Sequence, residues 1–486
     1  MATFTSKSGI MEATSGVTGL GRASFLERMK DQYLPKWDDM VNDKTVLLKL
    51  IGKKVGTIVG GKKSLTSVMT SYSQSAGIAL FEDDELPLPN APTYDQLTLF
   101  PRALYARVRF TGHVERAARA GNVAVFAKPV AEQLRSARRT HEMNKNRMLY
   151  LGPYQAMSRI VSVDTSSAGT AANPVITLRP REGRQPGVTG GADTLWDFGA
   201  QYLRDGMLLD FVKDSGGIQT AAAPEGNATC RPRIKSIASR NSAAPTITLE
   251  FADPTGASVA FQNAPDGDSL IIPFGSRLPS ASYVDATGAG DGHETSHAGV
   301  NGLFNLITDS NYAAHLYTKT RTAAEYLNGN VSRADAGSPR DPGDELIAKV
   351  LDQVSENTHN PGDDPDCIVV SPHTRRKWVS VLTDAKTPRM FSPIIKGRGY
   401  GKQSFTAGDT MLPFVQDKDC PPGAMFCIAK GTFGKFVEAP MHMPDGGERF
   451  VDGKDSREVV LVESFNMACK APTANAVIED LTYDVY

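Results

Sequence analysis

The chain has 486 residues, enough for about three domains of roughly 150 residues each and for well-buried cores. Its 53 basic and 54 acidic side chains leave a formal net charge of -1, which excludes the overall basic character of a general nucleic-acid binder. No apolar run reaches the ~18 residues that a membrane span needs. The first residues also lack the apolar core of a signal peptide, so we expect a globular protein that is neither secreted nor bound to a membrane.

Cysteine spacing points to the same kind of environment. The five cysteines form no C-x-x-C pair and are widely scattered: Cys230, Cys367, Cys420, Cys427 and Cys469. This pattern is typical of reduced, buried thiols. A disulfide between Cys420 and Cys427, which flank a Pro-Pro-Gly turn, remains an open alternative.

The N-terminal quarter has too few apolar residues to form a core. Residues 1–56 begin with a small, polar stretch and continue with two short patterns that each predict a helix with one apolar face. Residues 57–112 are polar and strand-like, and they contain an acidic run at 82–85. In the segment 104–111, apolar residues alternate with polar ones, which predicts a strand with one buried face. We expect an arm, then a long excursion that ends in a returning strand.

Residues 113–152 contain the clearest helix. Pro129 suits a first helical turn, and Gly152 ends the run. Apolar residues keep to one face, and we predict that the basic residues lie on the outer side: Arg135, Arg138, Arg139, Lys145 and Arg147.

Residues 153–298 are rich in strand patterns and contain a weak internal repeat. The segments 159–163 and 174–178 predict one hairpin, and 233–237 and 245–249 predict a second with similar residues. An apolar segment follows each hairpin. The pattern predicts a small barrel or sandwich, joined by a glycine-rich linker to a mixed α and β part that fills residues 299–486.

Two motifs suggest chemistry, and their surroundings argue against both. His293-Glu294-Thr295-Ser296-His297 matches the H-E-x-x-H of zinc peptidases, in which two imidazoles on one helical face hold the metal. Four glycines surround it here, which disfavours a helix. The segment 56–63 approaches a phosphate-binding loop, but Lys63 stands where the motif needs Ser or Thr. We therefore predict no catalytic residue, no metal and no cofactor.

The order of the parts resembles the major capsid proteins of tailed bacteriophages, which have the Hong Kong 97-like fold. Residues 105–152 look like that family's returning strand and spine helix. The step Gly302-Leu303-Phe304 fits the family's entry into its axial domain, and residues 344–382 and 408–478 look like the parts that follow. Residues 153–298 depart from the family pattern and look like an insertion.

The resemblance implies an α+β, Hong Kong 97-like capsid fold with an inserted β-rich domain. The implied parts follow in chain order: an N-terminal arm (1–56), an extended loop (57–112), the spine helix with the first part of the peripheral domain (113–152), the inserted domain (153–298), the axial domain (299–424), and peripheral strands that return to the axial domain (425–486).

The implied function is self-assembly into the icosahedral shell around the double-stranded DNA of a tailed phage. The implied partners are further copies in hexamers and pentamers, a separate scaffolding protein, the portal and decoration proteins. Packaged DNA would be a non-specific neighbour, and no membrane is involved. Such a protein would assemble in the host bacterial cytoplasm and reside in the virion.

One inter-subunit contact can be predicted from charge. In the resembled family the extended loop of one subunit crosses the spine-helix region of the next. We therefore expect the acidic residues Glu82, Asp83, Asp84 and Glu85 to meet the basic helix residues named above. Two other hypotheses remain open: a cargo-enclosing, encapsulin-like shell protein of the same fold, and a zinc peptidase built on His293 and His297.

Overall fold

The computed structural model describes most of the body of the chain. The described residues are 45–51, 53–54, 58–59, 63–71, 91–112, 129–151, 157–164, 173–179, 183–184, 196–197, 199–215, 218–221, 232–240, 244–251, 270–273, 300–310, 315–317, 319–334, 339–358, 364–384, 404–407, 410–443, 448–450 and 455–484. Within them, no helix is long and apolar enough to cross a membrane.

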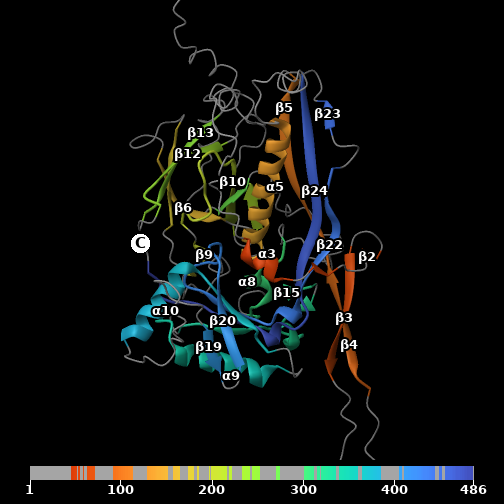
Figure 1. The fold of residues 1–486 in the computed structure, drawn as a ribbon, viewed down its shortest axis with the longest axis vertical. Helices are drawn as coiled ribbons and strands as arrows, with labels where there is room; N and C mark the ends of the chain where they lie inside the picture. The colour runs from red at the N-terminus through yellow and green to blue at the C-terminus, as the bar shows by residue number, and fades with distance from the viewer. Residues whose placement is uncertain are drawn as a thin grey trace, which may run out of the picture.

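A long helix and two long strands form the tallest part of the molecule (Figure 1). They are α5 (Pro129–Met148), β5 (Arg102–Thr111) and β24 (Ser456–Cys469). β5 pairs antiparallel with β24 from Thr111↔Ser456 to Arg102↔Phe465. The predicted alternation on β5 places Val108 inward, where it packs with Val459, Leu461 and the apolar side of α5. The expected returning strand and helix are therefore both present.

β24 is also the centre of a five-stranded sheet. Its other members are β1 (Lys53–Lys54), β22 (Phe433–His442) and β23 (Glu448–Phe450), in the order β1-β22-β24-β23. The N-terminal segment thus adds a short parallel strand to a sheet built mainly from C-terminal residues.

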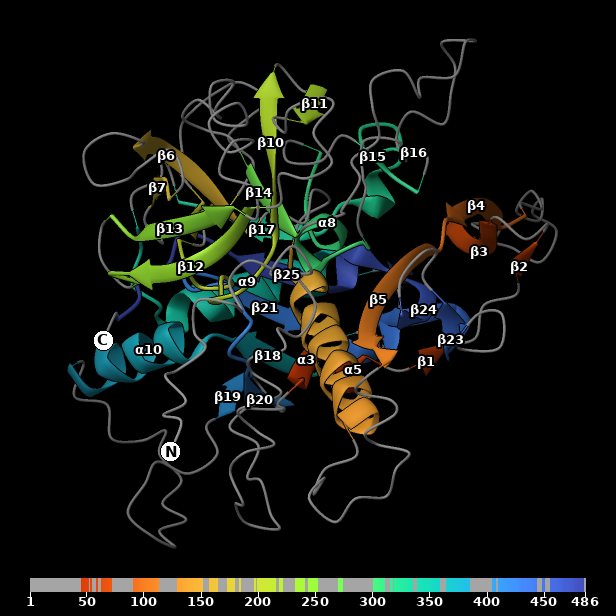
Figure 2. The same ribbon diagram turned by 90° about the horizontal axis from the view of Figure 1, so that it is seen from above.

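A second sheet of six strands lies below, and two helices pack against one face of it (Figures 1 and 2). Its order is β17 (Asn330–Ser332), β25 (Ala476–Ile478), β21 (Met425–Ile428), β18 (Cys367–Val370), β20 (Thr410–Gln416) and β19 (Ser404–Ala407). The helices are α9 (Asp344–Asn357) and α10 (Pro372–Asp384). Since β21 belongs to this sheet, the chain passes to the other sheet after Ile428, later than the boundary at 425 predicted from the sequence.

Seven strands between residues 158 and 273 form a third sheet. They are β6 (Ser158–Asp164), β7 (Val175–Leu178), β10 (Leu209–Ser215), β11 (Ile218–Ala221), β12 (Pro232–Ala238), β13 (Thr246–Phe251) and β14 (Leu270–Pro273). The order is β11-β10-β14-β6-β7-β13-β12, and the bridge Leu208↔Arg233 joins the start of β10 to β12. Six of the strands therefore close into a small barrel. The short pair β8 (Gly183–Arg184) and β9 (Trp196–Asp197) lies apart from this sheet.

The barrel has an internal two-fold symmetry that follows the sequence repeat. The second strands of the two hairpins pair with each other about Ile176↔Ile247. The flanking hydrogen bonds are reciprocal, Leu178 N to Pro245 O at 2.8 Å and Leu249 N to Pro174 O at 2.9 Å. Each hairpin also has a register shift at its matching isoleucine. The predicted repeat is confirmed by this register.

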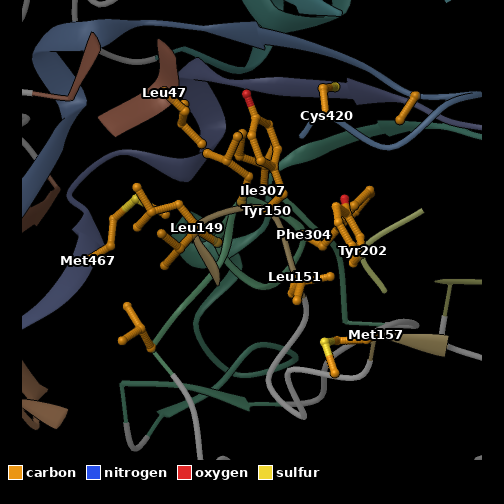
Figure 3. Packing of buried hydrophobic residues seen from close by; sticks show 14 of the residues in the cluster. Leu47, Leu149, Tyr150, Leu151, Met157, Tyr202, Phe304, Ile307, Cys420 and Met467 are labelled. Atoms are coloured by element: carbon orange, nitrogen blue, oxygen red, sulfur yellow. The ribbon is translucent and has the colours of Figure 1, made fainter. Parts of the chain in front are cut away.

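The barrel core is continuous with the core of the body. The residues labelled in Figure 3 come from the N-terminal segment, the end of α5, the barrel region, the helix α8 (Leu303–Leu306), the loop after β20 and the strand β24. α8 begins against the end of α5, with Leu303 N donating to Leu149 O at 2.7 Å. A Cβ on Gly302 would lie 1.8 Å from Leu151 O, so only glycine fits there. That residues 153–298 form a separate domain stays a prediction.

The segment predicted as the extended loop includes a β-hairpin that projects from the body (Figure 1, bottom right). The hairpin consists of β3 (Lys63–Ser71) and β4 (Thr93–Leu99), and the short β2 (Ile58–Val59) pairs antiparallel with β3 as a third strand. The predicted acidic tip at 82–85 lies between β3 and β4, outside the described residues.

The barrel symmetry predicts equal costs for equivalent substitutions. Ile176 and Ile247 are both fully buried at the symmetry axis. We expect Ile176→Ala and Ile247→Ala each to lower the free energy of unfolding by about 2–5 kcal/mol, by similar amounts, in urea titrations. Ser236→Ala, on the exposed side of β12, should change it by less than about 0.5 kcal/mol. A large cost at one isoleucine alone would contradict the symmetric core.

Candidate functional site

The features that could carry function are the polar junctions that hold the arm, the helix and the hairpin to the body. Among the described residues, no three His, Cys, Asp or Glu side chains gather as a metal site. His293 and His297 lie outside the described residues, as does most of the segment 56–63. Of the cysteines, the four that the structure describes are buried, and Cys420 and Cys427 are not joined by a disulfide in it.

The buried carboxylate of Asp417 joins three parts of the chain. Asp417 follows β20 and is fully buried. It accepts hydrogen bonds from the Tyr150 hydroxyl at 2.8 Å, the Asn146 amide at 3.1 Å and the backbone N–H of Leu47 at 3.2 Å. Burial, and then the adjacent Asp417, raise the pKa of Tyr150 well above its usual value, so its hydroxyl remains a donor. Because a buried acceptor left without donors is unfavourable, these contacts fix the relative positions of the three parts.

The N-terminal segment depends on this junction for its helical turn. α3 (Val46–Leu50) has only five residues and no side-chain cap of its own, so it would not be stable alone. Two backbone N–H groups of its first turn donate to side chains elsewhere in the chain. Leu47 N donates to Asp417, and Leu48 N donates to Asn146 Oδ1. The Leu47 side chain is fully buried beside Leu149 and Tyr150 (Figure 3). The arm is thus anchored to the body at its last residues.

This anchoring predicts the effect of truncating the Leu47 side chain. Leu47→Ala should lower the free energy of unfolding by about 2–5 kcal/mol and should speed amide hydrogen exchange in residues 45–51. Lys49→Ala, on the exposed side of the same turn, is the matched control and should do neither. Unchanged exchange in Leu47→Ala would show that the arm does not depend on this contact.

A second junction joins α5 to β24 through a buried carboxylate and two basic groups. The Glu463 carboxylate lies 2.5 and 2.7 Å from Lys145 Nζ and 3.1 Å from His141 Nε2. All three side chains are at most 7% exposed, and Lys145 Nζ also lies 4.9 Å from the centre of the Phe465 ring. Burial raises the pKa of Glu463, but the hydrogen bonds and charges of His141 and Lys145 outweigh it and lower the pKa to about 2.

The prediction that five basic residues lie on the outer side of α5 is therefore wrong for two of them. Lys145 is buried against Glu463, and Arg147 is buried with its guanidinium carbon 5.9 Å from the Tyr202 ring. Burial lowers the pKa of Arg147 to about 10. The cause is that the last turns of α5 lie between β24, the barrel and the Asp417 loop, so every side of the helix is covered there. Arg135 and Arg138 are exposed and Arg139 is partly exposed, as predicted.

The Glu463 junction predicts a pH-dependent stability. Its folded-state pKa is below the ordinary value of 4.5, so its contribution is complete above about pH 4.5 and is lost as the pH falls towards 2. Glu463→Gln should lower the free energy of unfolding by about 3–5 kcal/mol at pH 7, because Lys145 loses its buried partner. Adding Lys145→Met should restore part of that loss. A difference from wild type that stays constant between pH 6 and pH 3 would contradict this account.

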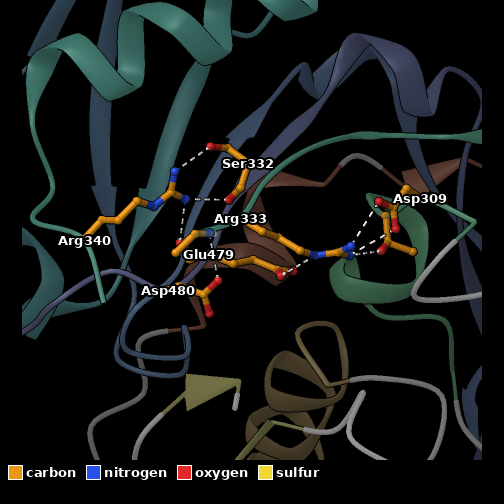
Figure 4. Close-up of polar contacts among 8 residues, drawn as sticks. Asp309, Ser332, Arg333, Arg340, Glu479 and Asp480 are labelled. Carbon is orange, nitrogen blue, oxygen red and sulfur yellow. Dashed lines mark hydrogen bonds and ion pairs between the residues drawn. The ribbon is translucent and has the colours of Figure 1, made fainter. Parts of the chain in front are cut away.

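A charged network ties the C-terminal segment to the six-stranded sheet (Figure 4). Arg333 contacts Asp309 at 3.0 Å and Glu479 at 3.1 Å. Arg340 donates to the backbone oxygens of Ser332 and Glu479 at 2.9 and 3.1 Å. These bonds continue the pairing of β17 with β25, so the end of the chain is fixed to this sheet.

Comparison with known proteins gives structural likenesses and no sequence match. No family model matches the chain, and no curated protein matches it. The chain is similar to a solved capsid asymmetric unit of cyanophage A-1(L), with 10% identity, coverage of 93% of this chain and 97% of that chain, and a TM-score of 0.48. It is also similar to a structure from Mycobacterium phage Ogopogo, with 10% identity, 94% and 98% coverage, and a TM-score of 0.38.

A third likeness is to the SrpI encapsulin complex of Synechococcus elongatus, with 8% identity, coverage of 95% of this chain and 98% of that chain, and a TM-score of 0.38. These solved structures thus include a phage capsid and an encapsulin. Because the identities are near 10% and the TM-scores lie below 0.5, the function has to be argued from the chain's own elements.

Proposed function

We propose that the chain is the major capsid protein of a tailed bacteriophage, which assembles with copies of itself into the icosahedral shell around the double-stranded DNA genome. The observation that carries the proposal is the projecting hairpin. Its strands form a small sheet of their own, and the outer end of this sheet exposes Thr93 and Tyr94 in the single chain. A neighbouring copy would supply the surface that it lacks.

The remaining elements support the same function. The long α5–β5–β24 unit extends along the body (Figure 1), and buried polar groups hold α5 and residues 45–51 in place. In the proposed shell the copies form hexamers and pentamers, with a separate scaffolding protein, the portal and decoration proteins as further partners. The protein would assemble in the bacterial cytoplasm and reside in the virion.

Electron microscopy of the expressed full chain, with metal analysis of the same sample, tests the proposal. Closed particles without a stoichiometric metal are expected. A protein that stays monomeric under all assembly conditions, with one zinc per chain, would instead favour the peptidase hypothesis at His293 and His297. Particles that enclose a co-expressed protein cargo rather than DNA would favour the encapsulin-like hypothesis.

We further propose that the acidic residues Glu82, Asp83, Asp84 and Glu85 contact the exposed basic face of α5 in a neighbouring copy. That face now consists of Arg135, Arg138 and Arg139, since Lys145 and Arg147 are buried within the subunit. Arg138 already pairs with Glu142 on its own helix at 3.2 Å. Each exposed pair would contribute only about 0.2–1 kcal/mol, but the contact recurs at every subunit boundary of a shell.

A charge swap tests this contact. Changing Glu82, Asp83 and Glu85 to Lys should reduce particle yield, and high salt should weaken wild-type assembly in the same direction because screening shortens to ~3 Å at 1 M. Adding Arg135→Glu, Arg138→Glu and Arg139→Glu in the same chain should restore yield. A first variant that assembles normally, or a second that restores nothing, would exclude these partners.

A further inference from the structure

The described part of the projecting hairpin packs on the body through residues of both strands, including Val68 of β3. On β4, Leu97 and Leu99 are 4% exposed and join the main core. Farther out on β4, Asp95 bonds to the body, and Tyr94, the next residue outward, is 65% exposed.

Two side chains of the body bind the Asp95 carboxylate. Lys319 Nζ donates to Oδ1 at 2.8 Å, and the Tyr326 hydroxyl donates to Oδ2 at 2.6 Å. Lys319 lies on β16 (Lys319–Thr320), and Tyr326 lies on the short helix η2 (Glu325–Leu327). These hydrogen bonds, first from Lys319 and then from Tyr326, lower the pKa of Asp95, so the carboxylate is charged at neutral pH.

The two partners are themselves held firmly. Tyr317, two residues before Lys319, has a φ of +52°, a conformation that an aromatic residue adopts only when its surroundings require it. Its hydroxyl bonds to Cys469 O at 3.1 Å and Cys469 N at 2.6 Å, at the end of β24. Arg321, fully buried, donates to the backbone oxygens of Asn305, Thr308 and Leu327, and so fixes the turn that carries Tyr326.

We propose that Asp95, Lys319 and Tyr326 form a releasable clamp that sets the direction in which the hairpin leaves the body. The proposal rests on the shell function proposed above, since the hairpin direction matters there for reaching a neighbouring copy. The three residues are positioning residues. Lys319 and Asp95 remain 39% and 30% exposed, and exposed ion pairs shift an equilibrium by about fivefold at most. A clamp of this strength holds the hairpin in the free chain, and it opens when a neighbouring copy provides the hairpin with a more favourable contact.

Hydrogen exchange on the full-length, unassembled protein tests the clamp directly. Asp95→Asn, Lys319→Met and Tyr326→Phe should each speed exchange in residues 63–71 and 91–96 by up to about fivefold, and combining the first two should add little. Exchange in 97–99 should change less, because Leu97 and Leu99 stay buried. Glu250→Gln, which breaks the similarly exposed Arg233–Glu250 pair of the barrel, is the matched control. Unchanged hairpin exchange in all three variants would overturn the clamp.

Particle imaging then tests the link to assembly. If the clamp sets the hairpin direction in a shell, the three variants should give a broader distribution of particle diameters than wild type and Glu250→Gln. Faster hairpin exchange with an unchanged diameter distribution would overturn that link. If the wild type forms no particles at all, the shell function fails, while the exchange experiment still decides the clamp.

Discussion

The structure depends most on one buried carboxylate. Asp417 directly follows β20, the strand next to the edge of the six-stranded sheet, and it accepts hydrogen bonds from the N-terminal segment and from the C-terminal end of α5. Those donors are also buried, so none could turn to water if the carboxylate moved away. The same few atoms therefore set the relative positions of residues 45–51, the end of α5 and the six-stranded sheet.

The same principle recurs where α5 meets β24. An apolar contact can slide, but Glu463 binds both His141 and Lys145 on successive turns of the helix, which sets the helix both along and around its axis. Lower down, the Arg333 network fixes the C-terminal segment in the same way. Apolar packing holds the layers together, and buried charges determine how they are aligned.

The sequence predicted the helices and strands more accurately than the polar contacts that join them. Period-two alternation identified β5, and similar β-branched segments identified both barrel hairpins, because one face of each is apolar. Lys145 was misplaced because a buried lysine has the same sequence signature as a solvated one until its partner, 318 residues away, is known. His141, four residues earlier within the apolar stripe, was the available hint. Nothing near Asp417 or Glu463 in the sequence marks them as central, since their partners are remote.

The contact between Leu149 and Leu303 determines where the chain can accept insertions or an exchanged domain. The backbone leaves the end of α5 and returns 2.7 Å away after some 150 residues, so the whole intervening barrel enters and exits at a single point. A segment with adjoining ends can be lengthened, shortened or exchanged without moving the elements on either side. Another domain could therefore replace the barrel at the end of α5, provided that it covers the apolar surface that the barrel shares with the body.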